Sequence, residues 1–365
     1  MRFPEFSGEW NKYTINDLAT VVGGGTPDTT VKSYWGGDIQ WFTPSEIGKN
    51  KYVDFSKRTI TRDGLDNSSA KLLPLHTILL SSRATVGECS IASNECTTNQ
   101  GFQSLIAKQC NIDFLYYLIQ TKKKDLIRNA CGSTFLEISA NEIRKIKVAV
   151  PVQNEQEQIA KLLSLIDERI ATQNKIIEKL ESLIRGIYKT LLGESDQYRY
   201  LDELCEIKKG VQVNKEKLSE KGLYYVMNGG ITPSGYYDLY NTEANTISIS
   251  EGGNSCGYVQ YNYTPFWSGG HCYTLENISN VVDNRYLFHY LKANELQIMS
   301  LRIGSGLPNI QKKDLSAFRI PLPALNKQIN IAKALDALLY KITVDKNIYS
   351  TYKQQKEYLL QQMFI

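Results

Sequence analysis

Histidine and closely spaced cysteines are scarce in this 365-residue chain, and their scarcity argues against several kinds of site. The three histidines lie far apart in the sequence, and the seven cysteines include no C-x-x-C pair. Zinc and redox sites usually show such spacings, so we expect no metal site. An odd number of scattered cysteines indicates reduced thiols, which are typical of a cytoplasmic protein.

Long apolar runs and phosphate-binding loops are also missing. No segment is long and apolar enough to span a membrane, and the N-terminal stretch lacks the apolar core of a signal peptide, so we expect a cytoplasmic location. The glycines at 23–25 are not followed by the Gly-Lys-Ser/Thr of a nucleotide-binding loop, and they lack the G-x-G-x-x-G spacing of dinucleotide sites. We therefore expect no cofactor bound to this chain.

The chain also has almost no excess of charge of one sign. The chain has 42 basic and 38 acidic residues and a formal net charge of +4. Such a weakly basic balance permits nucleic acid as a partner without requiring it. The 23 tyrosines are numerous, and they supply flat side chains with a hydrogen-bonding tip.

The most regular feature present is a long amphipathic segment after Pro151. Asn154 and Glu157 have the form of a capping box, which predicts that a helix begins at Asn154. Apolar residues then recur at alternating steps of four and three, which is the core spacing of a coiled coil. This seam consists of Ile159, Leu163, Ile166, Ile170, Ile177, Leu180, Ile184, Ile187 and Leu191, with Gln173 as its polar member.

The same pattern returns 172 positions later without a gap, so that Pro151 corresponds to Pro323 and Gln156 to Gln328. This correspondence is an internal repeat. The second seam consists of Ile331, Leu335, Leu338, Ile342, Tyr349, Tyr352, Leu359 and Met363, with Asp345 and Lys356 as polar members. We expect the two helices to form an antiparallel pair, seam against seam.

The repeat divides the chain into four segments: a globular domain at 1–150, a helix at 151–194, a second globular domain at 195–322 and a second helix at 323–365. Short β-branched segments separated by Gly, Asn and Ser predict strands mixed with helices in both domains. The expected fold class is α+β, with two globular α/β-mixed domains separated by two long antiparallel coiled-coil helices in a pseudo-two-fold repeat. The loops differ most between the copies, which suits two modules that bind different versions of one ligand.

Segments from the whole length of the chain resemble one known family, the specificity subunits of type I restriction-modification enzymes. GGGTPDTTVKSYWGGDIQW, SSAKLLP and TTNQGFQSL resemble the family's first target-recognition domain, and GGITPSGYYDLYNTEANTISISEGGNSCGYV and PFWSGGHCYTL resemble the second. The P-x-x-x-E-Q-x-x-I-A pattern resembles its spacer regions; in this chain the pattern consists of Pro151, Glu155, Gln156, Ile159 and Ala160. The second copy has Lys327 in place of Glu155.

The resemblance implies a DNA-recognition subunit without catalytic activity of its own. Such a subunit would read a bipartite target in double-stranded DNA and direct the methylation and cleavage subunits. Its implied partners are two modification subunits, which bind S-adenosylmethionine, and restriction subunits, which use ATP with Mg²⁺. The Asn/Asp-Pro-Pro-aromatic motif expected of a DNA amino-methyltransferase is missing from the sequence, so we expect the partners to supply catalysis.

Residues able to contact DNA are predicted mainly in the loops of the two domains. The candidates for base contact have side chains that donate or accept at base edges, or a backbone that allows close approach; Arg83, for example, can pair with guanine. They are Gly24, Thr26, Ser82, Arg83, Thr85 and Gln100 in the first domain and Asn228, Ser250, Asn254, His271, Ser305 and Asn309 in the second. The candidates for phosphate contact are Lys145, Lys147, Lys312, Lys313 and Arg319.

Other interpretations stay open from the sequence. Each loop residue taken alone also fits ordinary turn chemistry, and Trp41 and Trp267 fit core positions better than base stacking. A coiled-coil seam can simply join two domains, so the alternative function is an interaction scaffold that carries two domains for a non-DNA ligand, such as carbohydrate or peptide. A self-sufficient methyltransferase or nuclease lacks its motifs here.

Overall fold

The computed structural model describes residues 2–132, 136–190, 192, 195–304, 306 and 308–364. The chain forms two compact units, one of residues 1–174 with 347–365 and the other of residues 175–346. Each unit therefore contains one globular domain and part of both long helices. This division differs from the four consecutive segments expected from the sequence, because each domain packs against its own portion of the long helices.

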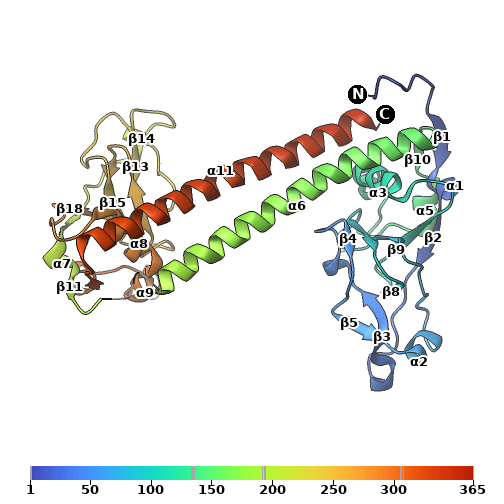
Figure 1. Ribbon diagram of the computed structural model, residues 1–365, viewed down its shortest axis with the longest axis horizontal. Coiled ribbons are helices and arrows are strands. Elements are labelled where there is room, and N and C mark those ends of the chain that lie inside the picture. Colours follow the sequence, from blue (N-terminus) through green and yellow to red (C-terminus); the bar gives the residue numbers. More distant parts are fainter. Residues whose placement is uncertain are drawn as a thin grey trace. The chain divides into compact units, whose positions relative to one another are not determined.

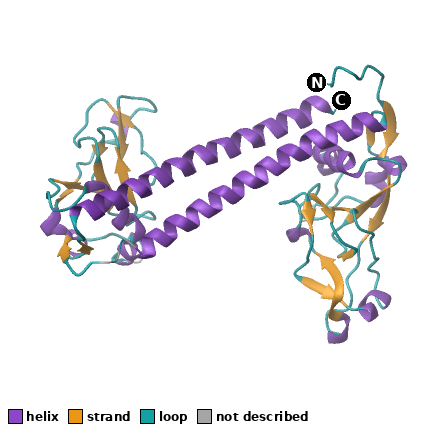
Figure 2. Ribbon diagram, in the orientation of Figure 1, coloured by secondary structure: helices purple, strands orange, loops and turns teal. Residues whose placement is uncertain are grey.

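The first unit is built on two sheets, which Figure 2 colours orange among its helices. The larger has the strand order β2-β9-β6-β7-β4: β2 (Ala19–Gly23), β9 (Gln103–Ala107), β6 (Ile78–Leu80), β7 (Cys89–Ala92) and β4 (Tyr52–Val53). The smaller has the order β5-β3-β8: β5 (Arg58–Ile60), β3 (Trp35–Phe42) and β8 (Cys96–Thr98). A separate antiparallel pair joins β1 (Asn11–Thr14) to β10 (Lys147–Val150).

The second unit repeats this plan, but among the described residues its larger sheet has no counterpart of β4. Its larger sheet has the order β12-β18-β15-β16: β12 (Glu206–Lys209), β18 (Cys272–Glu276), β15 (Thr246–Ser250) and β16 (Val259–Asn262). Its smaller sheet has the order β14-β13-β17: β14 (Tyr236–Tyr237), β13 (Tyr224–Met227) and β17 (Trp267–Ser268). The remaining pair joins β11 (Tyr198–Tyr200) to β19 (Arg319–Pro321). In both units the smaller sheet contains one parallel pair, β3 with β8 and β13 with β17.

Helices complete each domain, and among the described residues α2 of the first domain has no counterpart in the second. The first domain has α1 (Ile15–Leu18), α2 (Arg62–Asp66), α3 (Ile112–Thr121), α4 (Lys123–Arg128) and α5 (Ala140–Lys145). The second has α7 (Leu201–Leu204), α8 (Asn284–Ala293), α9 (Glu295–Ser300) and α10 (Lys312–Ser316). Single 3₁₀ turns lie at Lys32–Tyr34, Pro44–Glu46 and Lys215–Lys217.

The two long helices are α6 (Gln153–Thr190) and α11 (Leu325–Met363), drawn in green and red in Figure 1. In the first unit the last turns of α11 lie beside the first turns of α6, and Lys356 forms an ion pair with Asp167 at 2.7 Å. In the second unit Lys346 pairs with Glu181 at 2.8 Å. The order of these contacts is antiparallel, as predicted.

The predicted seam is the buried stripe of both helices. Ile159, Leu163 and Ile166 share a core with Leu359 and Met363 in the first unit. In the second unit Ile184 shares a core with Ile331, Leu335 and Ile342. Lys356, a polar member of the seam, is held by the Asp167 carboxylate. Leu191 lies outside the described residues.

The start of α6 corrects one prediction from the sequence. The helix begins at Gln153, and the carbonyl of Val152 accepts hydrogen bonds from the backbone N–H groups of Glu155 and Gln156 at 3.0 and 3.1 Å. Asn154 therefore lies inside the first turn and is not its N-cap. The Gln156 amide donates to the carbonyl of Pro151 at 2.9 Å, which holds the chain as it enters the helix.

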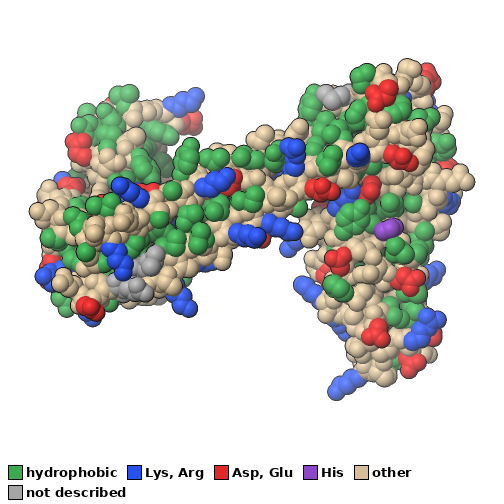
Figure 3. Space-filling view, viewed as in Figure 1, with side chains coloured by type: hydrophobic (Ala, Val, Ile, Leu, Met, Phe, Trp, Pro, Cys, Tyr) green, Lys and Arg blue, Asp and Glu red, His purple; other side chains and the backbone are tan. Residues whose placement is uncertain are grey.

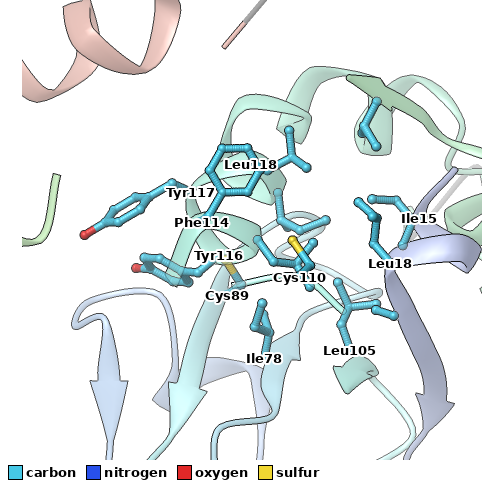
Figure 4. Packing of buried hydrophobic residues seen from close by; sticks show 14 of the residues in the cluster. Ile15, Leu18, Ile78, Cys89, Leu105, Cys110, Phe114, Tyr116, Tyr117 and Leu118 are labelled. Atoms are coloured by element: carbon cyan, nitrogen blue, oxygen red, sulfur yellow. The ribbon is translucent and has the colours of Figure 1, made fainter. Parts of the chain in front are cut away.

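Figure 4 shows the core of the first domain, in which α3 covers the larger sheet. Phe114 and Leu118 of α3 belong to one buried cluster with Ile78 of β6 and Leu105 of β9. The α6 residue Leu163 closes this cluster from the helical side. The domain and the long helices thus share one hydrophobic core.

Candidate nucleic-acid interface

Two glycine-containing loops meet at one edge of the first domain. The N–H of Gly25 donates to the carbonyl of Thr98 at 2.8 Å, and a Cβ on Gly24 would lie 2.0 Å from the carbonyl oxygen of Asn99. Only glycine permits this approach. The Thr26 hydroxyl donates to the Gln100 side chain across the contact. The structure therefore brings together Gly24, Thr26 and Gln100, as a shared binding site requires.

The loop after β6 lies next to them. The N–H of Ser82 donates to the carbonyl of Gly101 at 2.8 Å, and the carbonyl of Ser82 accepts from the N–H of Ile138 at 2.9 Å. Ser82 is fully buried, so it positions the loop and presents no side chain at the surface. Arg83 and Thr85 are exposed, but the Arg83 guanidinium is paired with the Glu137 carboxylate at 2.7 Å.

The second domain brings four loops together around the end of β15. The Asn228 side chain accepts from the N–H of His271 at 3.0 Å, and the Ser250 hydroxyl donates to the carbonyl of Gly229 at 2.7 Å. Asn309 forms a β-bridge with Gly252. Ser250 is buried, whereas Asn254, His271 and Asn309 are exposed. The predicted residue Ser305 lies outside the described residues.

The two domains build this edge with the same backbone bonds. In the first, the N–H of Ser82 bonds to Gly101 and its carbonyl to Ile138. In the second, the N–H of Glu251 donates to the carbonyl of His271 at 2.9 Å, and its carbonyl accepts from Ile310 at 2.8 Å. Glu251 thus stands where the first domain has Ser82. One scaffold therefore presents two different sets of side chains.

The predicted phosphate contacts are all exposed lysines or arginines outside these loop clusters. Lys145 ends α5 and pairs with Glu142 at 2.8 Å, and Lys147 lies on β10 opposite Thr14. Lys312 and Lys313 form the first turn of α10, and the Arg319 guanidinium lies 4.7 Å from the ring of Tyr198. On the face drawn in Figure 3, basic and acidic side chains are interspersed and form no single basic patch.

A stacked arginine near the first cluster was not predicted from the sequence. The Arg58 guanidinium lies 3.6 Å from the centre of the Trp35 ring and 5.5 Å from that of Trp41. The indole of Trp41 is buried, as expected, and donates to the carbonyl of Gly25 at 2.9 Å. The available signal was that Trp41 and Arg58 are cross-strand neighbours on β3 and β5, which requires the strand pairing to be known.

Glu251 and Lys209 were not predicted either, because an acid is not an obvious residue for a DNA-binding surface. Lys209 lies at the end of β12, and its ammonium pairs with the Glu251 carboxylate at 2.6 Å. Trp267, predicted at a core position, is half-buried, and its indole donates to the carbonyl of Val211 at 2.7 Å.

Among the described residues, no three or more His, Cys, Asp or Glu side chains lie together in a way that could hold a metal ion. Burial raises the pKa of Cys89, Cys96 and Cys110 to about 12, so these thiols stay protonated and unreactive at neutral pH. Across the described part of the chain, no helix is long and apolar enough to cross a membrane. The chemistry that this surface offers is hydrogen bonding and charge.

Solved structures show the class of protein to which this fold belongs. A type I restriction-modification system S subunit from M. genitalium matches with a TM-score of 0.71 at 20% identity, over 100% of this chain and 99% of that one. A chain from a structure concerning assembly and conformational transition of the type I R-M system matches with a TM-score of 0.59 at 14% identity, over 98% of both chains. The fold is that of these S subunits.

Sequence comparison then gives the family. The family model for the type I restriction modification DNA specificity domain matches residues 7–182 and 195–353, so the chain belongs to this family. The MjaIX specificity subunit of Methanocaldococcus jannaschii is 37% identical over 221 residues, which cover 57% of this chain and 50% of that subunit. The EcoprrI specificity subunit of Escherichia coli is 24% identical over 354 residues, which cover 90% and 86%. This chain matches about half the length of the M. jannaschii relative.

Proposed function

We propose that this chain is the sequence-specific DNA-recognition subunit of a type I restriction-modification complex and that it reads a bipartite target in double-stranded DNA. The observation that carries the proposal is the repeated loop edge. The larger sheets of the two domains share the order of four strands, β2-β9-β6-β7 and β12-β18-β15-β16, and the same backbone bonds at this edge. They present different polar side chains there, Gln100 with Thr26 in one and His271 with Asn309 in the other. A repeated scaffold with different loops suits two half-sites of unlike sequence.

Within this proposal the loop-edge residues that are not buried contact base edges. In the first domain these are Gly24, Thr26, Arg83, Thr85 and Gln100, and in the second Asn228, Asn254, His271 and Asn309. Ser82 and Ser250 hold their loops in place, since both are buried. Lys145, Lys147, Lys312, Lys313 and Arg319 contact phosphates, which adds affinity without sequence preference.

The long helices set the number of unread bases between the half-sites. Each is continuous, with 38 residues in α6 and 39 in α11. Each also shares a hydrophobic core with a globular domain, so neither is a loose linker. Their faces away from the seam dock two modification subunits.

Catalysis belongs to partner subunits. Two modification subunits bring S-adenosylmethionine and methylate the target, and restriction subunits bring ATP and Mg²⁺ for cleavage. The chain itself binds no cofactor and is not an enzyme. Its proposed partners, DNA and these subunits, place it in the cytoplasm.

The test is a mobility-shift assay with the full chain and the modification subunits encoded beside it. We expect a shift of duplexes that carry one split sequence, weakening steeply as salt rises, because phosphate contacts release counterions. A scrambled duplex of equal length and composition is the control. Equal binding of both duplexes, or no binding at any salt concentration, would support the alternative, a coiled-coil interaction scaffold with two domains for a non-DNA ligand.

A further inference from the structure

The second domain contains a buried acid that the proposed DNA contacts leave unexplained. Glu251 follows β15 directly and is 8% exposed, in the place where the first domain has Ser82. Negative charge beside a polyanion lowers affinity, so an acid at this edge needs a specific reason.

The two oxygens of the Glu251 carboxylate have different surroundings. Oε1 accepts from the Lys209 ammonium at 2.6 Å and from the Tyr273 hydroxyl at 3.2 Å. Oε2 is buried and has no hydrogen-bond partner among the described residues. It lies 3.6 Å from Nδ1 of His271, a distance for electrostatic attraction but too long for a hydrogen bond. The carboxylate is thus anchored through one oxygen and faces the imidazole with the other.

Two hydrogen bonds hold the backbone of His271 in place. The N–H of His271 donates to the Asn228 side chain, and its carbonyl accepts from the N–H of Glu251. A Cβ on Gly229, whose φ is +81°, would lie 3.1 Å from the Cβ of His271, so the neighbouring turn packs closely against it. The His271 side chain nevertheless remains 65% exposed. An exposed ring on a rigid support is well suited to reading a base.

We propose that Glu251 is a positioning residue that keeps the His271 proton on Nδ1, so that Nε2 faces DNA as a hydrogen-bond acceptor. A carboxylate favours the proton on the ring nitrogen nearest to it, and the other nitrogen of a neutral imidazole then accepts. In the major groove only adenine N6 and cytosine N4 donate, whereas guanine and thymine present acceptors. His271 therefore accepts a hydrogen bond from the N6 amino group of an adenine or the N4 amino group of a cytosine in the second half-site. This inference rests on the proposed DNA-recognition function.

A purely structural role for Glu251 makes a different prediction. If the acid only ties Lys209 to the loop, its replacement weakens binding to all sequences alike. If it positions His271, its replacement changes the preference at one base pair. The two roles are therefore separated by a profile of base preferences and not by affinity alone.

The experiment selects duplexes from a fully randomised pool with the complete complex of this chain and its modification subunits. We expect the wild-type complex to enrich a split motif, and His271→Ala and Glu251→Gln each to weaken the preference at one and the same base pair of the second half-site about fivefold or more. A duplex in which the adenine or cytosine of that pair lacks its exocyclic amino group should bind the wild-type complex more weakly. Lys209→Ala should lower affinity and keep that preference. The matched control is Glu276→Gln. Glu276 pairs with Lys208 and lies at the end of β18 that is farther from His271, so its replacement should leave the preference at every base pair unchanged.

The inference is overturned if Glu251→Gln leaves the profile unchanged, if the two variants relax different positions, or if a duplex in which the adenine or cytosine of the His271-sensitive pair lacks its exocyclic amino group is bound as tightly as the unmodified duplex. If Glu251→Gln does not fold, His271→Ala still identifies the base pair that His271 contacts, because His271 is exposed and its replacement should not unfold the domain. A wild-type complex that enriches no motif contradicts the proposed function itself, which distinguishes the two failures.

Discussion

At the scale of single residues, the glutamine of each repeat joins a long helix to its domain. Gln156 accepts from the N–H of Asn111 at 3.0 Å and donates to the carbonyl of Pro151. Gln328 accepts from the N–H of Asp283 at 2.9 Å and donates to the carbonyl of Pro323 at 2.8 Å. Asn111 and Asp283 are the N-caps of α3 and α8. The repeated glutamine therefore has a structural reason, since it ties the start of each long helix to the cap of a domain helix.

Replacing this glutamine should destabilise the first unit. In Gln156→Ala the N–H of Asn111 and the carbonyl of Pro151 lose their bonds to a buried side chain, which should cost about 1–3 kcal/mol. Urea unfolding followed by circular dichroism measures the loss. The control is Gln153→Ala, an exposed position in the same helical turn, which should stay within about 0.5 kcal/mol. Equal effects of the two changes would refute the role of Gln156.

The Arg58 guanidinium is the second residue whose role can be isolated. It is exposed and stacked on Trp35, which orients its planar group without requiring a neighbouring acid. If the Arg58 guanidinium contacts a phosphate, Arg58→Ala should weaken binding of the complex to target and non-target duplexes by a similar factor. The slope of log K against log salt concentration should also become less steep by about one. Titrations at several salt concentrations measure this. Arg62→Ala, which removes an exposed arginine already paired with Asp66, should have little effect; a matching loss would count against Arg58.

At the scale of elements, α8 docks on α11 through a buried histidine. His289 is fully buried, and its Nε2 lies 2.8 Å from the Asp336 carboxylate, which also pairs with Arg285. The 172-residue offset places Tyr117 at the corresponding position of α3, where its hydroxyl donates to Asp167 of α6 at 2.7 Å. The two domains thus contact the long helices through different polar pairs at matching places.

This difference predicts that only the second contact depends on pH near neutrality. Burial lowers the pKa of His289, although the hydrogen bond to Asp336 opposes this shift. Below the usual histidine pKa of about 6.5 the unfolded chain binds the proton more readily, so stability present above that pH is lost as the pH falls. The α8 amides should therefore lose protection against hydrogen exchange towards pH 5, once the measured rates are corrected for the intrinsic slowing of exchange at lower pH. His289→Gln should reduce this change, whereas His76→Gln, at an exposed position of the first domain, should leave it; no reduction would contradict the assignment.

The length of the long helices makes a further prediction. Removing one heptad from both α6 and α11 preserves the seam and shortens each helix by about 10 Å. The gap between the half-sites should then shrink by up to about 3 base pairs, because stacked pairs lie about 3.4 Å apart. Selection of duplexes with variable gaps measures this. Removing the heptad from α6 alone leaves two helices of unequal length and serves as the control. An unchanged gap in the double deletion would refute the role of the helices.

The regular elements were predictable from the sequence because their signals are periodic. Apolar residues at steps of three and four marked the seam, and the fixed offset of 172 positions marked the repeat. The loop edges were predictable only as sets of polar residues. Burial of Ser82, the Arg83–Glu137 pair and the anchoring of Glu251 depend on strand pairings between distant segments. No local pattern in the sequence records those pairings.

At the scale of the whole molecule, the proposed function requires that one chain specifies both halves of a split target. The two copies share a fold and a mode of attachment to the helices, and they differ in the residues exposed at the loop edge. Each domain should then be responsible for one half-site. Changes confined to His271 or Asn309 should affect the second half-site and leave the first unchanged.

The most direct measurement is a map of methylated bases across the host genome with this gene intact, deleted and restored. We expect a split motif with a fixed gap that loses methylation on deletion and regains it on restoration. Methylation that is the same in all three strains, in cells that express the modification subunits, would contradict the proposed function.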